Sequence, residues 1–232
     1  DIVSPLYIVQ LLNWFAEGGG AAPRRTVDFV SARVERLPPD ARRILQALAV
    51  LGEASADLIG EVAGQTVDDD VLSLLVRRGW IDCDGVNGHR RLRVAHPLYR
   101  DVLRASAPAA AAEDFHRASL RIAEHLELPV EVRAMHAAHA HDVFHALVLL
   151  ETVGDRAIAR GDGVSAARAL RRALDLARRD LARGYLGESE GAVVIFARKL
   201  GEALMLCGDV IEAEGVLREG LGVAPRGSVE QL

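Results

Sequence analysis

The stretch WIDCDGVNGHRRLRV, residues 80–94, decides the fold of this chain. Two short runs with strand character, residues 80–83 and 90–94, lie on either side of the turn-forming segment DGVNGH. Gly and Asn tolerate the backbone conformations that tight hairpin turns need. The sequence therefore predicts a β-hairpin here.

Helical patterns lie on both sides of this hairpin. Thr26 is a candidate N-cap for the first helix, and Ser55 for a short later one that Gly64 would end. The predicted helices before the hairpin cover residues 26–37, 39–51, 55–64 and 66–79, and a further helix follows His96-Pro97. Several helices closed by a hairpin is the element order of a winged helix. We expect that domain over residues 26–105.

A separate helix is predicted ahead of this domain. Residues 5–16 are amphipathic, and Pro5 lies in the first turn, where its missing N–H costs nothing. Gly18, Gly19 and Gly20 end the helix, and a short linker follows. Residues 1–25 therefore form a first segment, and because the chain starts with Asp1 on this pattern we expect it to be part of a longer protein.

The remainder, residues 106–232, is predicted to be helical and contains an internal repeat. Gly154, Gly161-Asp162 and Leu170 recur with the same spacing as Gly201, Gly208-Asp209 and Leu217. These small and apolar positions match those of tetratricopeptide repeats, which are helical hairpins. We expect two repeats, at 147–180 and 194–227, with Pro225 as the late proline and some extra residues near 181–193 between them. The fold class is thus mainly all-α, a winged helix followed by tetratricopeptide-like hairpins.

Composition excludes several classes of protein. The 232 residues include 28 basic and 33 acidic side chains, a net charge of −5, which disfavours a nucleic-acid binder. Lys199 is the only lysine and lies within a helical pattern, so the chain has no phosphate-binding P-loop. Cys83 and Cys207 fit two thiols in a reducing compartment, and no apolar run is long enough to cross a membrane. A cytoplasmic location is expected.

No set of side chains suggests a catalytic or metal centre. Four histidines, His136, His139, His141 and His145, cluster in a helical stretch. They fall into two pairs on nearly opposite faces, and neither pair has a carboxylate or cysteine set to complete it. The acidic run Asp68–Asp70 is explained by its place at a helix start. We assign no catalytic and no metal-binding residue and expect no enzymatic activity.

Direct DNA binding by the winged helix is an alternative. Residues 26–104 carry 11 basic and 12 acidic side chains, and the helix in the recognition position begins with Asp68-Asp69-Asp70. Those carboxylates would face the phosphates. The hairpin does carry Arg90, Arg91 and Arg93, and these are the best argument for a DNA-binding transcription regulator.

The order of these segments resembles the middle of bacterial STAND-type regulators, which are multidomain signalling ATPases that include large LuxR-type transcription factors. Their order is an ATP-binding core, a helical lid, a winged helix and tetratricopeptide-type repeats. VSPLYIVQLL resembles the lid motif GNPL[FY], although Val3-Ser4 stands where Gly-Asn is usual. VSARVERLPPDARRILQALAVLG resembles the helix pair that opens the winged helix, RLRVAHPLYRDVL its closing segment, and MHAAHAHDVFHALVLLETVGDRAIARGD the beginning of the repeats.

The resemblance implies a non-catalytic regulatory fragment of a signal-transduction ATPase. In this family Pro5 would lie against the adenine of a nucleotide, and His96 would approach a phosphate of bound ADP. An imidazole can donate a hydrogen bond to a phosphate oxygen. The ATP or ADP would be held by an ATPase core outside this segment, and the segment would hold no cofactor of its own. The repeats would bind a protein partner or inducer.

Overall fold

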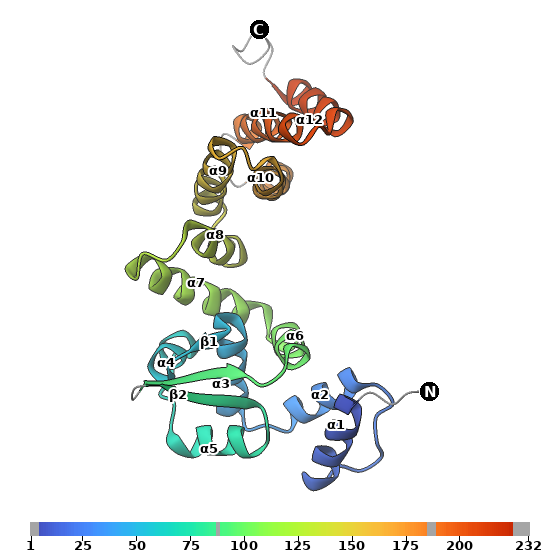
Figure 1. Cartoon of the computed structure of the whole chain (residues 1–232), viewed down its shortest axis with the longest axis vertical. Coiled ribbons are helices and arrows are strands. Elements are labelled where there is room, and N and C mark those ends of the chain that lie inside the picture. Colours follow the sequence, from blue (N-terminus) through green and yellow to red (C-terminus); the bar gives the residue numbers. More distant parts are fainter. Residues whose placement is uncertain (1–4, 87–88, 185–188, 225–232) are drawn as a thin grey trace. The chain divides into compact units, whose positions relative to one another are not determined.

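The computed structural model describes residues 5–86, 89–184 and 189–224 (Figure 1). The protein is mostly helical, with one small antiparallel sheet, and divides into two compact units, Asp1–Ser119 and Leu120–Leu232. Among the described residues, no helix is long and apolar enough to cross a membrane.

The first unit contains the winged helix. Its helices are α1 (Pro5–Ala16), α2 (Thr26–Glu35), α3 (Pro39–Leu51), α4 (Ala56–Ala63), α5 (Asp69–Arg77), α6 (Pro97–Ser106) and the start of α7 (Ala109–His125). Its strands are β1 (Glu53–Ala54), β2 (Ile81–Val86) and β3 (His89–Val94). The predicted hairpin is confirmed: β2 and β3 pair antiparallel, with Ile81 opposite Val94 and Cys83 opposite Leu92. Sequence reasoning missed β1, which adds a third strand on the other edge of β3.

Capping follows the sequence at one helix and departs from it at two others. The Ser55 hydroxyl accepts the Leu58 N–H at the start of α4, and Gly64 ends that helix in the left-handed conformation, as predicted. The prediction that Thr26 is an N-cap is wrong, because Thr26 is the first helical residue and Arg25 occupies the cap position. Asp68 does hold the N-cap position of α5, but its side chain makes no capping hydrogen bond. It therefore stabilises the helix only through its negative charge near the positive end of the helix dipole.

Helix α3 is the centre of the first unit. Its residues 44–50 are all buried, which is unusual for a helix and indicates that neighbours cover it on nearly every side. It packs against α4, α6, β1 and β3 (Figure 1). Trp80, Leu92 and Leu103 are buried in the same unit.

The second unit is a series of packed helices. It contains the end of α7, then α8 (Val130–His139), α9 (Val143–Ala159), α10 (Gly163–Arg183), α11 (Ser189–Cys207) and α12 (Val210–Val223). Its core is rich in alanine and leucine, with Ala157, Leu170, Ala173 and Ala203 fully or almost fully buried. Small side chains allow such close helix packing.

One turn occurs three times in this unit. His141, Gly161 and Gly208 each take a positive φ after a helix. The next residue, an aspartate each time, donates its N–H to the carbonyl five residues earlier and caps the following helix with its side chain. The repeated GD pattern in the sequence thus corresponds to one turn geometry, and His141-Asp142 is a third copy in which histidine replaces the glycine.

The two expected repeats contain the same close contact. A Cβ added to Gly154 would lie 2.7 Å from the Leu170 side chain, and one added to Gly201 would lie 2.8 Å from Leu217. A larger residue at Gly154 in α9 or Gly201 in α11 would therefore force the leucine of the crossing helix to move. These contacts agree with the tetratricopeptide-like assignment, which remains a prediction, and Pro225–Gly227 lies outside the described residues.

Candidate functional site at the junction of helices α1, α2 and α6

A buried arginine forms the centre of the junction between α1 and the winged helix. Arg33 on α2 is only 1% exposed. Its Nη1 donates to Gln10 Oε1 at 2.7 Å, and its Nη2 donates both to Glu17 Oε1 at 2.7 Å and to the Arg78 carbonyl at 2.8 Å. Its Nε also faces Glu17, with Oε2 at 3.1 Å. One guanidinium therefore links α1, the turn after α1 and the end of α5.

Arg33 has both a charge partner and an aromatic partner. The Glu17 carboxylate accepts from two nitrogens of the guanidinium, which is the geometry that suits a planar fork of N–H donors. The guanidinium carbon also lies 4.6 Å from the ring centre of Trp80, a cation–π contact. Most of its five N–H groups are thus bonded, as a buried cation requires.

Two aromatic rings and an amide connect this cation to α6. Trp80 and Tyr99 meet edge to face at 5.4 Å, and Gln10 Nε2 donates to the Tyr99 hydroxyl. Burial raises the pKa of the Tyr99 phenol above its usual value, although nearby Arg33 opposes the shift. The phenol is therefore neutral at pH 7.

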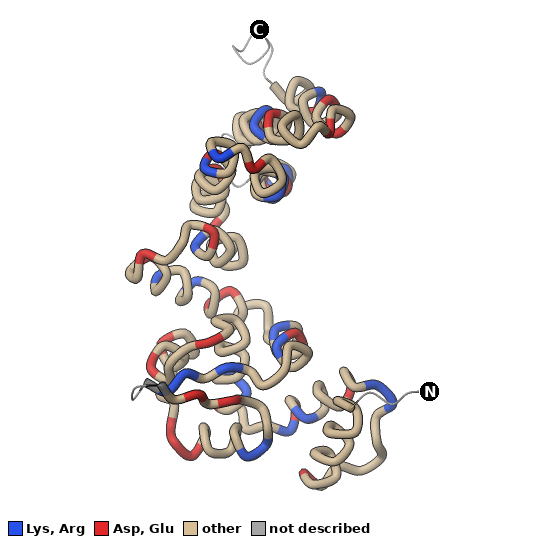
Figure 2. The backbone as a smooth tube through the Cα atoms, viewed as in Figure 1, with Lys and Arg blue, Asp and Glu red and all other residues tan. Residues whose placement is uncertain are grey.

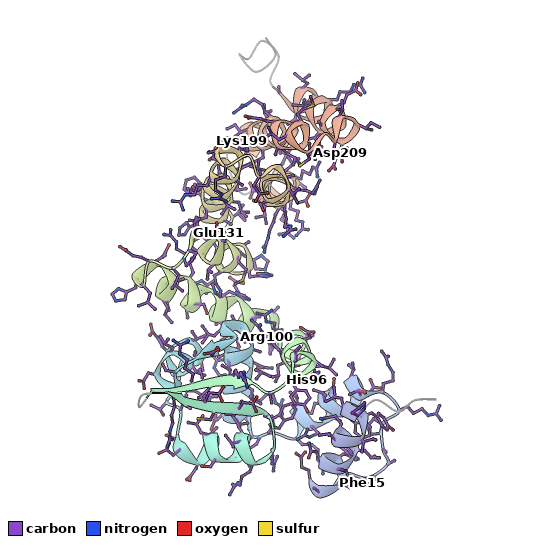
Figure 3. All side chains as sticks on the ribbon, viewed as in Figure 1. Phe15, His96, Arg100, Glu131, Lys199 and Asp209 are labelled. Carbon is purple, nitrogen blue, oxygen red and sulfur yellow. The ribbon has the colours of Figure 1, made fainter. Side chains whose placement is uncertain are left out.

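His96 lies at the edge of this network, at the start of α6 (Figure 3). Its Nδ1 accepts the Leu98 N–H at 3.0 Å, so the side chain acts as the N-cap of α6 and Pro97 occupies the first helical position. Its ring centre is 5.6 Å from that of Tyr99. With Nδ1 accepting, a neutral ring carries its proton on Nε2, and that atom can donate a hydrogen bond.

Pro5 is not part of this network. It is exposed at the first turn of α1, while Val3-Ser4 of the resembled lid motif lies outside the described residues. Helix α1 is instead anchored through Tyr7 and Trp14, whose rings contact Phe29 at 5.2 and 6.1 Å. The structure therefore brings His96, but not Pro5, together with the buried polar cluster.

The opposite face of α1 is apolar and uncovered in the first unit. Ile8, Leu12 and Phe15 recur every three to four residues and are 48%, 64% and 55% exposed. Figure 3 labels Phe15 at the end of this helix. One face of α1 is thus packed on the winged helix, and the other presents an apolar stripe.

The hairpin arginines that favour DNA binding are largely engaged with acids of the same sheet. Arg91 Nη1 lies 3.1 Å from Glu53, and Arg93 contacts Asp82 at 3.3 Å and Asp84 at 3.6 Å. Such exposed pairs contribute little to stability, but they cancel the positive charge that phosphates would meet. Acidic side chains also begin α5, the helix in the recognition position.

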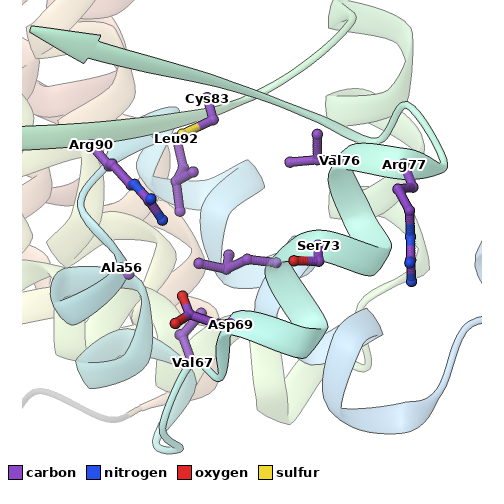
Figure 4. Close-up of a pocket in the computed structure, with 10 residues that line it drawn as sticks. Ala56, Val67, Asp69, Ser73, Val76, Arg77, Cys83, Arg90 and Leu92 are labelled. Carbon is purple, nitrogen blue, oxygen red and sulfur yellow. The ribbon is translucent and has the colours of Figure 1, made fainter.

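A shallow groove lies between α5 and the hairpin (Figure 4). Its volume is about 520 Å³, and its walls include Leu72, Val76 and Leu92, with Arg90 and Arg77 among the polar residues around them. It is mostly apolar and open. Its hydrogen-bond donors are those of Arg77, Arg90 and Ser73, and the Asp69 carboxylate lies in the same lining.

The histidine-rich stretch is divided among different surroundings. His136 is buried, and His141 occupies the tight turn described above. His145 Nε2 lies 3.1 Å from Glu124, and its Nδ1 lies 3.7 Å from Asp142. Within the described parts of the chain, no three His, Cys, Asp or Glu side chains are grouped to hold a metal ion.

Comparison with known proteins gives one family match, which lies within the first unit. Residues 32–115 match the family model of the MalT winged helix domain. The match covers somewhat over a third of the chain, from within α2 to within α7, and it includes Arg33, Trp80, His96 and Tyr99. No curated protein and no solved structure matches the chain.

The MalT-type match confirms a winged helix and supports a regulator of the STAND kind, and it leaves the roles of Pro5 and His96 as predictions. Sequence reasoning missed Arg33, Gln10 and Glu17. The available signal was Arg33 itself, which lies between Val30 and Val34 on the apolar stripe of its helix. A charged residue at such a position predicts a buried acidic or polar partner, but the sequence does not identify that partner.

Proposed function

We propose that this chain is a non-catalytic regulatory module that transmits the nucleotide state of an ATPase core to a partner-binding helical region. The observation that carries the proposal is the Arg33 junction within a MalT-type winged helix. It fixes α1, the expected end of the lid, to the domain that also holds His96. A rigid connection of this kind lets two sites influence one two-state element.

The apolar stripe of α1 supports the same proposal. Ile8, Leu12 and Phe15 are exposed although α1 is anchored on its other face. An exposed apolar stripe of this size is typical of a surface that another protein domain covers, and the ATPase core of the same protein is the expected partner. The segment itself would then neither hydrolyse ATP nor bind nucleotide tightly.

His96 is the proposed contact to ADP in the inactive state. Its Nε2 would donate to a phosphate oxygen while Nδ1 keeps its bond to the Leu98 N–H. A plain alanine substitution would remove both interactions. His96→Asn keeps a side-chain acceptor for capping, because Asn is a good N-cap, and shortens the reach toward a phosphate.

The test uses the natural protein with its ATPase core and measures the dissociation rate of a fluorescent ADP analogue. We expect H96N to release ADP at least about tenfold faster, which corresponds to about 1.4 kcal/mol. His125→Asn, a substitution of an exposed histidine at the end of α7, is the matched control. Equal release rates for H96N and the parent protein would contradict the phosphate contact. A natural protein without an ATP-binding core would contradict the whole proposal.

A further inference from the structure

A row of arginines follows one face of α10 in the second unit. The helix carries six arginines within 21 residues, but only two acidic residues, Asp175 and Asp180. Figure 2 colours basic residues blue and acidic residues red along the chain. Four of the arginines share one face: Arg168, Arg172, Arg179 and Arg183. At about 100° per residue they lie within an arc of about 60° and extend over about 22 Å of the helix.

The other two arginines of α10 have partners on a neighbouring helix. Arg171 Nη2 lies 2.6 Å from Glu212 of α12, and Arg178 Nε lies 2.7 Å from Glu219 of the same helix. Hydrogen bonding to Arg178 lowers the pKa of the Glu219 carboxyl, as expected for a real ion pair. Arg178 also binds Asp175, at 2.8 Å. These two arginines therefore already have acidic partners on α12.

The four arginines of the row differ from these. Among the described residues, none of the four forms an ion pair. Arg168, Arg179 and Arg183 are exposed and Arg172 is half-buried. Asp162, the N-cap of α10, lies close enough to Arg168 for their charges to interact, and this is the acidic group near the start of the row. Asp175 lies beside the middle of the row, but it pairs with Arg178. The four arginines therefore leave an excess of positive charge on this face.

We infer that this row is a docking surface for an acidic face of an α-helix in a protein partner. A helix with carboxylates at the same intervals rises by the same 1.5 Å per residue, so its acids align with all four guanidiniums at once. The inference rests on the proposed partner-binding role of the helical region and names the chemistry of that partner.

The charge of the whole unit argues for a protein and against a nucleic acid. Residues 120–232 contain 14 basic and 17 acidic side chains, a net charge of −3. A phosphate backbone would be repelled by that net charge and attracted only along one line. A helical partner with a single acidic face needs only that line.

The experiment measures binding of a labelled peptide to the full chain by fluorescence anisotropy. The peptide is an alanine-based helix with four Glu at the intervals of the row, and a second peptide of the same composition has its Glu distributed around the helix. We expect the matched peptide to bind at low salt at least about fivefold more tightly than the redistributed one, and to weaken as salt increases.

Two triple variants with the same charge change make the test specific. The first is R168Q with R172Q and R179Q, and the second is R121Q with R156Q and R198Q, which removes exposed arginines of other helices. We expect the first to weaken binding of the matched peptide at least about tenfold and the second less than about twofold. All but Arg172 are exposed, and circular dichroism checks that both variants fold.

Three results would overturn the inference: equal binding of the two peptides, an equal loss in both triple variants, or no binding. Tighter binding of duplex DNA that depends on the same row would overturn it too, and would assign the surface to a nucleic acid. The function proposed above is tested through ADP release by His96 variants, so its failure is distinguishable from failure of this row.

Discussion

At the scale of single residues, Arg33 is a buried cation at the junction of several segments of the first unit. Its charge is matched by the Glu17 carboxylate, whose side chain is 12% exposed, while its own side chain is inaccessible. Burying a cation costs free energy that only good partners offset. Its partners come from three separate segments, so removing it affects the whole junction.

We therefore predict that Arg33→Met destabilises the first unit by about 3 kcal/mol, because Glu17 and Gln10 lose a buried partner. Both tryptophans, Trp14 and Trp80, are in this unit, so urea unfolding followed by tryptophan fluorescence measures the effect. Arg24→Met, at an exposed arginine of the linker, is the control. A loss for R33M no larger than that of the control would show that the network contributes little.

His141 is a residue in a backbone conformation that suits glycine. Its φ is 55°, whereas glycine occupies the corresponding place in the other two turns of the same kind. A side chain in the left-handed region costs about 1 kcal/mol. We predict that His141→Gly raises the free energy of unfolding by about that amount in thermal or urea denaturation. His141→Ala keeps a Cβ and should give no comparable gain in the free energy of unfolding. Equal effects of the two variants would show that the backbone at His141 is not strained.

At the scale of elements, a glycine lies where the two helices of each hairpin cross. A Cβ at Gly201 would meet Leu217 at 2.8 Å, while one at Gly215 on α12 would have no neighbour within 4 Å. We predict that Gly201→Ala destabilises by about 1–3 kcal/mol through overpacking. Gly215→Ala should stabilise by about 0.5–1 kcal/mol, because alanine loses less entropy in a helix. Chemical denaturation followed by circular dichroism measures both, and effects of the same sign would contradict the packing.

The ion pair between α10 and α12 predicts a pH dependence. The pKa of Glu219 is lowered in the folded state, chiefly by the hydrogen bond from Arg178. A carboxyl with a lowered folded pKa stabilises above its unfolded pKa, and this stabilisation is lost as the pH falls through the folded value. Because the pair is largely solvated, its contribution is at most about 1 kcal/mol.

We therefore expect Glu219→Gln to be less stable than the parent chain near pH 7 and to approach it as the pH falls below about 4. Urea denaturation at a series of pH values measures the difference. Glu202→Gln, at an exposed position of α11, should show no such convergence. A difference for E219Q that is constant with pH would exclude the ion pair as its cause.

At the scale of the whole molecule, the chain consists of two compact units with different cores. The first is built on α3 and the sheet, and the second on alanine-rich helix contacts. We predict that R33M lowers the denaturant midpoint of the unfolding transition seen by tryptophan fluorescence. G201A should lower the midpoint only for the part of the circular dichroism signal that comes from the second unit. Tryptophan fluorescence that moves equally with G201A would show that the two units unfold as one.

The sequence alone determined the hairpin, the helices around it and two of the three repeated turns, because their signals lie within a few residues of one another. Ser55 and Gly64 bound one helix, a Gly/Asn segment joins two strands, and each GD pair ends one helix and caps the next. These are local preferences of the backbone and need no distant partner.

Only the tertiary structure decided what the charged residues do. Arg33 meets Glu17, Gln10 and the Arg78 carbonyl, which are 16, 23 and 45 positions away in the chain. One hairpin arginine, Arg91, pairs with Glu53. The His96 side chain caps its own helix and its ring contacts that of Tyr99. Long side chains find their partners through packing, and a sequence pattern shows the charge but not the neighbour that balances it.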